Sequence, residues 1–116
     1  MASLVQAIKR MTQSMPIPAP LVAQTMSACT PLFFALGEPA RQQILVLLTE
    51  HEELNVNQLT ERLPLSRPAI SHHLKVLRQA GLVGVRQAGV ENFHYLTVEP
   101  AIELLERFVA EVKDCE

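Results

Sequence analysis

Apolar residues recur at the three- and four-residue spacing of amphipathic helices over much of the chain, and prolines and glycines interrupt that spacing. The prolines of the MPIPAP segment end the first such stretch, and Gly37 ends a short later one. Thr30-Pro31 and Glu38-Pro39 each place a proline at the start of a helix, where its missing N–H is tolerated. The pattern therefore predicts helices over 1–15, 21–29, 31–36 and 38–50.

Two further short helices are expected next, joined by a tight turn at Pro64. Asn55 or Asn57 caps the first, and Ser66 caps the second, which stops at Gly81. The second helix has a regular buried stripe of Ile70, Leu74 and Leu77. Its opposite face is short, polar and positive, and presents Pro68, Ser71, His72, Lys75 and Gln79, with Arg67 and Arg78 at the edge.

Alternating residues after this helix predict two strands, over 82–86 and 92–98, around a QAGVE turn that contains Gly89. Glu99-Pro100 then opens a last helix. Its apolar stripe consists of Ile102, Leu105, Phe108 and Val112. The elements together predict a mainly α fold with a small β-hairpin.

Composition narrows the class of protein. With 116 residues and 48% hydrophobic residues the chain fits one domain with a real core, and that core must be aliphatic because only 4% of residues are aromatic. No apolar run approaches the roughly 18 residues that span a bilayer, and no signal peptide is recognisable. Two cysteines without a secretory signal favour the reducing cytoplasm. A membrane protein and a secreted disulfide scaffold are not expected.

Charge is distributed unevenly, although the net charge is only −2. Residues 62–90 contain no acid and carry +5, whereas residues 1–61 carry −2 and residues 91–116 carry −5. The basic side chains of this central segment are Arg62, Arg67, Lys75, Arg78 and Arg86. A basic island in an acidic chain is the electrostatic footprint of a nucleic-acid-binding surface.

Two short helices, a tight turn and a hairpin, with the basic island on the second helix, predict a winged helix-turn-helix. The major groove of DNA admits one helix of this kind, and its polar face suits base edges and phosphates. A helix used only for packing would leave the absence of acids over 62–90 unexplained. A winged helix that docks an acidic protein partner stays open as an alternative.

The same segment resembles a known family. LNVNQLTERLPLSRPAISHHLKVLRQAGLV closely resembles the helix-turn-helix of the ArsR/SmtB family of bacterial transcriptional repressors. FFALGEPARQQILVLL is similar to that family's preceding helix pair, and the hairpin with GVENFHYL resembles its wing. The resemblance covers residues 31–112. It implies a homodimer, with the first and last helices at the interface, that binds an inverted-repeat operator in double-stranded DNA and is released by a signal.

This resemblance divides the chain into a helical arm over residues 1–30, which joins the dimer interface, and a winged helix-turn-helix domain over 31–116. The DNA-contacting residues that it implies are Arg41, Arg67, Ser71, His72, Lys75, Arg78, Arg86 and Gln87. Ser71, His72 and Lys75 are the main expected base or phosphate contacts. Arg41 is expected to contact phosphate, and His73 to pack against the core.

One departure from the family pattern affects the wing, and one arginine has an alternative role. Val90 follows Gly89 where the family often has arginine, which leaves Arg86, Gln87 and His94 as weaker wing contacts. Arg78 could equally pair with Glu61 or another acid.

The metal sites of the family do not carry over to this chain. The segment Glu53-Leu54-Asn55-Val56-Asn57 has asparagine at both positions where the family places metal-binding cysteines, and amides are poor ligands for soft metals. The last helix has no histidine for the second family site. His51 among Glu50, Glu52 and Glu53 is expected to be solvated. We therefore expect no metal and no cofactor.

The remaining candidates for a signal are few. The positions of the family's cysteine switch are Val46 and approximately Val109. Cys29 and Cys115 would meet if the terminal helices pack together, which keeps a redox-responsive repressor as an alternative. A small organic inducer, or none, stays open. No nucleophile–base arrangement or phosphate-binding glycine loop suggests an enzyme.

Overall fold

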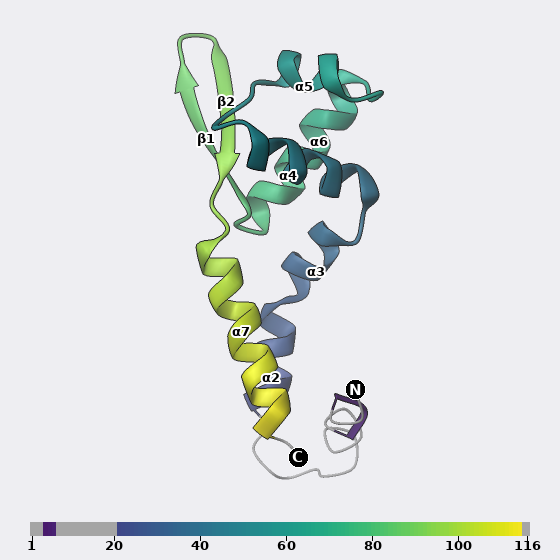
Figure 1. The fold of residues 1–116 in the computed structure, drawn as a ribbon, viewed down its shortest axis with the longest axis vertical. Helices are drawn as coiled ribbons and strands as arrows, with labels where there is room; N and C mark the ends of the chain where they lie inside the picture. Colours follow the sequence, from purple (N-terminus) through teal and green to yellow (C-terminus); the bar gives the residue numbers. More distant parts are fainter. Residues whose placement is uncertain (1–3, 7–20, 115–116) are drawn as a thin grey trace. The chain divides into compact units, whose positions relative to one another are not determined.

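The computed structural model describes residues 4–6 and 21–114 of the chain. Its internal contacts form two compact units, Pro31–Ala101 and the combination of Met1–Thr30 with Ile102–Glu116. Figure 1 gives the order of the elements along the chain. The larger unit contains the helix-turn-helix and the hairpin that the sequence predicts.

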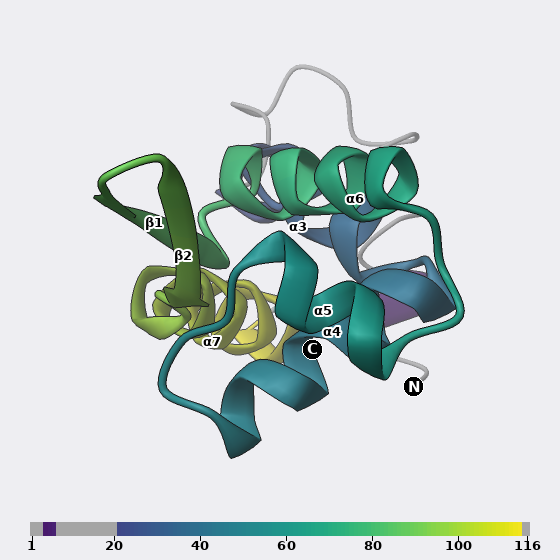
Figure 2. The same ribbon diagram turned by 90° about the horizontal axis from the view of Figure 1, so that it is seen from above.

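The larger unit contains four helices and one two-stranded sheet. Its helices are α3 (Thr30–Leu36), α4 (Pro39–Glu50), α5 (Val56–Arg62) and α6 (Arg67–Gln79). α6 packs against both α4 and α5, and in Figure 2 it runs along one side of the unit with these two helices beside it. The fully buried side chains at this junction are Ile44, Leu59, Ile70, Leu74 and Leu77. The predicted stripe of α6 is therefore confirmed, and it forms the centre of this core.

Local capping explains where α5 and α6 begin. Asn55 accepts a hydrogen bond from the Gln58 backbone N–H, and the Gln58 side chain accepts one from the Asn55 N–H, each at 2.8 Å. This reciprocal capping box selects Asn55 over Asn57 as the cap. Ser66 accepts a hydrogen bond from the Ala69 N–H and caps α6 as predicted.

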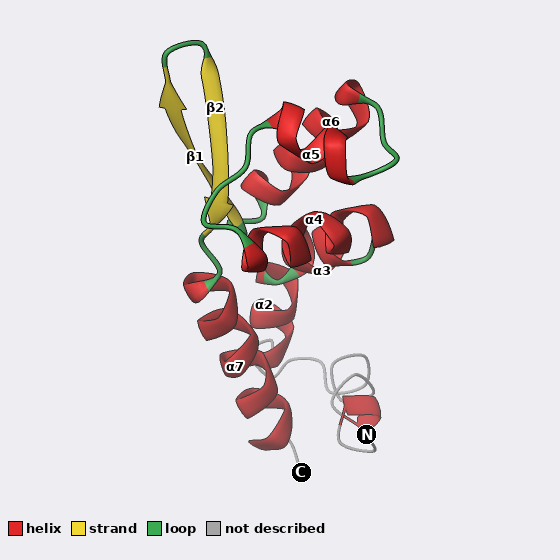
Figure 3. Cartoon of the chain, turned by 45° about the horizontal axis from the view of Figure 1, so that its top comes forward, coloured by secondary structure: helices red, strands yellow, loops and turns green. Residues whose placement is uncertain are grey.

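Gly81 follows α6 with φ of +76°, a backbone conformation that residues with a Cβ rarely adopt. Strands β1 (Val83–Ala88) and β2 (Glu91–Leu96) then pair as an antiparallel hairpin, drawn as arrows in Figure 3. Gly89, with φ of +64°, lies in the turn.

The strand boundaries differ by about two residues from those predicted. The first strand continues to Ala88 because Gln87 and Ala88 still pair with Asn92 and Glu91 across the tight turn. The second strand ends at Leu96, and the Thr97 hydroxyl donates to the carbonyl of Gly81. Leu54 forms an isolated bridge with His94, which attaches the segment before α5 to the middle of β2.

The second unit contains α2 (Leu21–Ala28) and most of α7 (Glu99–Asp114). Val22 and Val112 form a buried apolar cluster in it, and Leu4 and Phe108 pack against them. The Thr25 hydroxyl donates to the Glu111 carboxylate at 2.6 Å, which links α2 to α7. Residues 4–6 are helical, and the rest of the helix predicted over 1–15 lies outside the described residues.

Candidate nucleic-acid interface

The exposed face of α6 carries the polar residues that the sequence predicts for it. Their exposure follows from the periodicity of the helix, because Ile70, Leu74 and Leu77 turn the other face into the core. Arg78 is exposed and its Nη1 lies 3.5 Å from Nε2 of His94, so its described partner is a histidine rather than an acid. The exposed predicted contacts on α6 are Arg67, Ser71, His72, Lys75 and Arg78.

Arg67 connects the beginnings of the two helices of the motif. Its Nη2 donates to Oδ1 of Asn57 on α5. Asn57 thus has a structural role in place of the metal-binding role that its family position suggests. The remaining guanidinium donors of Arg67 stay available at the start of α6.

Arg41 lies inside the fold, and the structure corrects the phosphate contact expected of it. Its side chain belongs to α4, and the residue is only 6% exposed. Its Nε donates to the Ala35 carbonyl at 2.8 Å, and its Nη2 donates to the Phe34 carbonyl at 3.0 Å. Nη1 lies 3.1 Å from Nδ1 of His73. Arg41 therefore holds the end of α3 and the middle of α6 together.

His73 packs as predicted, on the half-buried side of α6. Burial lowers its pKa below the ordinary value of 6.5, and the neighbouring Arg41 guanidinium lowers it further. A neutral imidazole accepts the hydrogen bond from Arg41 through Nδ1. This contact links α6 to α4.

Arg86 and Gln87, two of the three predicted wing contacts, point to opposite faces of the hairpin, because consecutive strand residues alternate. Arg86 forms a salt bridge with Glu53 at 2.5 Å, and its guanidinium lies 5.0 Å from the centroid of the Phe93 ring. The Arg86 hydrogen bond lowers the pKa of the Glu53 carboxyl. Arg86 therefore has its charge offset, whereas Gln87 shares a face with Asn92 and His94.

His94 is buried rather than exposed, so its expected role as a wing contact at the surface is wrong. It is 2% exposed, and its Nδ1 has no hydrogen-bond partner. Burial lowers its pKa, and Arg78 lowers it further. The alternation of β2 could have revealed this position, because His94 lies on the same face as the half-buried Leu96.

The half-buried His73 and the buried His94 predict a specific dependence of stability on pH. Because both pKa values are lower in the folded state, the unfolded chain binds more protons below about pH 6.5. The free energy of unfolding should be highest above this pH and fall as the pH falls toward the folded-state values. In urea titrations from about pH 7 to 5.5, a His73→Gln, His94→Gln double variant should show a flatter slope than the parent. His51→Gln at the end of α4 is the control, and an unchanged slope in the double variant would contradict this account.

The thiol candidates have unequal environments. Cys29 is fully buried, and burial followed by the nearby Glu111 carboxylate raises its pKa. A buried thiol with a raised pKa is a poor nucleophile, which weighs against the redox alternative. Cys115 lies outside the described residues. In the described residues no group of three or more His, Cys, Asp or Glu side chains is placed to hold a metal ion.

The fold and this surface define a class of protein. A buried helix-turn-helix core, a basic second helix and a following hairpin form a winged helix-turn-helix that binds DNA. Comparison with known proteins agrees: the family model "Bacterial regulatory protein, arsR family" matches residues 38–85. The chain belongs to the ArsR family of bacterial regulators and is a DNA-binding transcriptional regulator.

Named relatives include both activators and repressors. The transcriptional activator HlyU of Vibrio cholerae is 42% identical over 79 residues, which are 66% of this chain and 72% of that protein. The biofilm growth-associated repressor of Agrobacterium fabrum is 31% identical over 94 residues, 81% of this chain and 80% of that protein. A solved ArsR-like regulator from Rhodococcus sp. RHA1 superposes with a TM-score of 0.68 at 30% identity, covering 79% of this chain and 86% of that one.

Within the described part of the chain, no helix has both the length and the apolar character needed to cross a membrane.

Proposed function

We propose that the protein is a homodimeric repressor that acts in the cytoplasm by binding an inverted-repeat operator and leaves it in response to a signal. The observation that carries this proposal is the exposed, basic, acid-free face of α6 over a fully buried stripe. A rigid helix with this face presents side chains to a major groove at fixed positions. The role is one of binding and requires no catalysis. Selection of operator sequences from random duplexes in vitro tests it directly.

The proposed base contacts are Ser71 and His72. Lys75 is proposed to contact a base edge or a phosphate. Ser71→Ala and His72→Ala should each reduce discrimination between operator and random duplex by about 1–3 kcal/mol, the usual value of a lost base contact. Competition binding of the two duplexes measures this ratio.

Gln43→Ala is the control, since Gln43 is exposed on α4 and lies outside the polar face of α6. Equal losses for operator and random duplex in the Ser71 and His72 variants would show that these side chains do not read bases.

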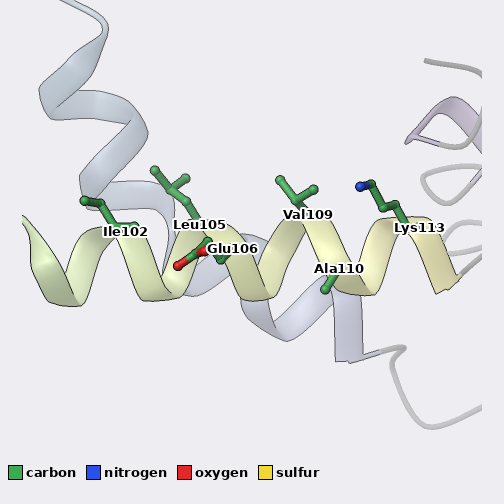
Figure 4. Close-up of a pocket in the computed structure, with 6 residues that line it drawn as sticks. All are labelled: Ile102, Leu105, Glu106, Val109, Ala110 and Lys113. Carbon is green, nitrogen blue, oxygen red and sulfur yellow. The ribbon is translucent and has the colours of Figure 1, made fainter.

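The proposed dimer uses the face of α7 that the described chain leaves open. Ile102 and Val109 are each 49% exposed, and in Figure 4 they project from the same side of the helix as Leu105 and Lys113. They line an apolar hollow of about 430 Å³ on that side. A second copy of α7 supplies apolar groups to fill it.

Placing a charge in this hollow should prevent association. Val109→Glu should shift the protein from dimer to monomer at micromolar concentration, because an unpaired carboxylate would be buried in the interface. Glu103→Gln, on a different exposed side of α7, should leave the dimer intact. Sedimentation velocity distinguishes the two states, and a parent protein that is itself monomeric would exclude the dimer.

The signal is proposed to be a small organic inducer, because the described residues show no metal cluster and the Cys29 thiol is buried. The genes beside the selected operators would identify its chemical class. If duplex binding is weak and indifferent to salt, the alternative of a protein-docking winged helix is favoured instead.

A further inference from the structure

The same kind of contact, between a histidine and an arginine, joins α6 to α4 and to β2. On the α4 side, Nη1 of Arg41 lies 3.1 Å from Nδ1 of His73. On the β2 side, Nη1 of Arg78 lies 3.5 Å from Nε2 of His94. A guanidinium has only donors, so the imidazole is the acceptor in each contact and must be neutral. Both links therefore exist only while the two histidines are unprotonated.

The surroundings of His73 hold a cation in place. Arg41 is 6% exposed and its other donors bind two backbone carbonyls of α3, so the guanidinium cannot turn away from a second positive charge. Burial lowers the pKa of His73, and Arg41 and His72 lower it further, while the Glu38 carboxylate before α4 raises it less. A proton on His73 would lie beside a fixed guanidinium.

His94 is more deeply buried, at 2% exposed. Burial lowers its pKa, Arg78 lowers it further, and the Leu54 backbone opposes these effects only in part. Arg78 itself is exposed on α6, so its guanidinium is free to move into the solvent. A proton on His94 would therefore repel Arg78 and break the link between α6 and the wing.

The elements beside His94 bring more positive than negative charge to it. Their charged or titratable residues are Arg67, Lys75 and Arg78 with His72 and His73 on α6, Arg41 and Glu50 on α4, His51, Glu52 and Glu53 before α5, and Arg86 on β1. Lys75 and Arg78 line a small hollow together with His94, and no acid lines it. Glu50 and Glu52 are exposed, and Glu53 is paired with Arg86. Among the described residues, no carboxylate raises the pKa of His94.

We propose that the two contacts form an acid-sensitive switch, in which protonation of His73 and His94 breaks the links from α6 to α4 and to the wing and the protein releases its operator. The release of an operator rests on the proposed function. Protons would thus act on the placement of α6 itself, apart from any inducer that binds elsewhere. Two histidines give a steeper response than one, because each broken contact takes up its own proton.

The contacts are tested without DNA by following the imidazole NMR signals of the full chain from about pH 7.5 to 5. His73 and His94 should stay neutral below the ordinary midpoint of about 6.5. Arg78→Gln should raise the midpoint of His94, because it removes the neighbouring cation. Arg62→Gln, which removes the same charge from α5, is the control and should leave that midpoint in place. A His94 signal that titrates at the ordinary midpoint, or that responds equally to both variants, would overturn the proposal.

Operator release is tested by competition binding of operator against random duplex from about pH 7 to 5.5. The random duplex corrects for the stronger general attraction to phosphate that protonation brings. In the parent, the logarithm of the affinity ratio should fall in acid with a slope of about two per pH unit, one for each proton taken up. His73→Gln and His94→Gln each keep a neutral acceptor for the arginine, so the double variant should lose this slope. His51→Gln should keep the slope of the parent.

Helical circular dichroism at each pH value shows whether the chain stays folded while it releases the operator. A loss of helical signal over the same range would indicate acid unfolding and would overturn the switch. Equal slopes in the parent and in the double variant would also overturn it. If no operator can be selected, the proposed function fails, and the imidazole titration still decides whether the two contacts are lost in acid.

Discussion

Arg41→Leu should lower the free energy of unfolding by about 3 kcal/mol or more, the largest loss expected from replacing any single polar side chain of the larger unit by an apolar one. The variant removes three hydrogen bonds at once, to the carbonyls of Phe34 and Ala35 and to His73. It also removes the stacking of the guanidinium over the Phe34 ring. Those carbonyls lie in the last turn of α3, where few N–H groups follow to satisfy them: Phe34 accepts from the Gly37 N–H at 3.3 Å, and Ala35 accepts from Arg41. Leucine fills much of the volume but leaves the Ala35 carbonyl without the donor that Arg41 supplies.

Gln42→Leu is a matched control for this change. Gln42 is the next residue of α4 and donates to the next carbonyl, that of Leu36, at 2.7 Å, but it is exposed. Water can replace the hydrogen bond of Gln42. The Gln42→Leu change should therefore alter the free energy of unfolding by no more than about 0.5 kcal/mol. Urea unfolding of the two variants compares the free energy lost with a buried side chain-to-carbonyl hydrogen bond and with an exposed one. Similar values for both would show that burial of Arg41 contributes little.

The same variant separates the structural role of Arg41 from the phosphate role that the family resemblance implied. A lost phosphate contact would reduce the salt dependence of DNA binding, whereas a lost internal clamp would not. Arg41→Leu protein that is still folded at low temperature should therefore keep the salt dependence of the parent.

Local features of the fold could be predicted from the sequence because each depends on neighbouring residues. The stripe of Ile70, Leu74 and Leu77 follows from helical periodicity, and Ser66 and Gly81 mark the ends of α6 by local hydrogen bonding and backbone freedom. Their prediction required no knowledge of the rest of the chain.

Burial of polar groups could not be predicted in this way. Arg41 is buried because α3 ends beside it and because His73, 32 residues later, offers an acceptor. Charged residues are almost never fully buried, so the sequence alone favours an exposed Arg41. Strand alternation indicates the face on which His94 lies, but its pairing with Leu54, 40 residues earlier in the sequence, is a contact that no local pattern reveals.

The wing shows a partial failure of a different kind. Arg86 and Gln87 were predicted together as contacts, although adjacent strand residues face opposite sides. Arg86 then pairs with Glu53, 33 residues earlier, which offsets the charge of Arg86. Gln87 faces the other side and remains the polar group that is open to a ligand. The alternation of side chains along a strand predicts that Arg86 and Gln87 face opposite sides. It does not predict which residue each of them contacts.

The apolar stripe predicted on α7 is likewise divided in the structure. Val112 is buried and Phe108 is half-buried beside α2, whereas Ile102 is half exposed. The apolar surface is therefore wider than one helix partner covers. This width is what a helix needs if it packs within its own chain and also against a second copy.

Operator affinity should fall about 10³- to 10⁵-fold between 50 and 200 mM salt if the dimer makes six to ten phosphate contacts. The chain is acidic overall, so this dependence must come from the basic island and not from net charge. Lys75→Gln should reduce the slope of log K against log salt by about 1.8, which is roughly 0.9 for each of two subunits. Arg86→Gln should reduce it less, because Glu53 already offsets that charge. Fluorescence anisotropy over this salt range measures both slopes. Equal reductions would place the wing arginine on the phosphate backbone, and an unchanged slope in Lys75→Gln would remove α6 from it.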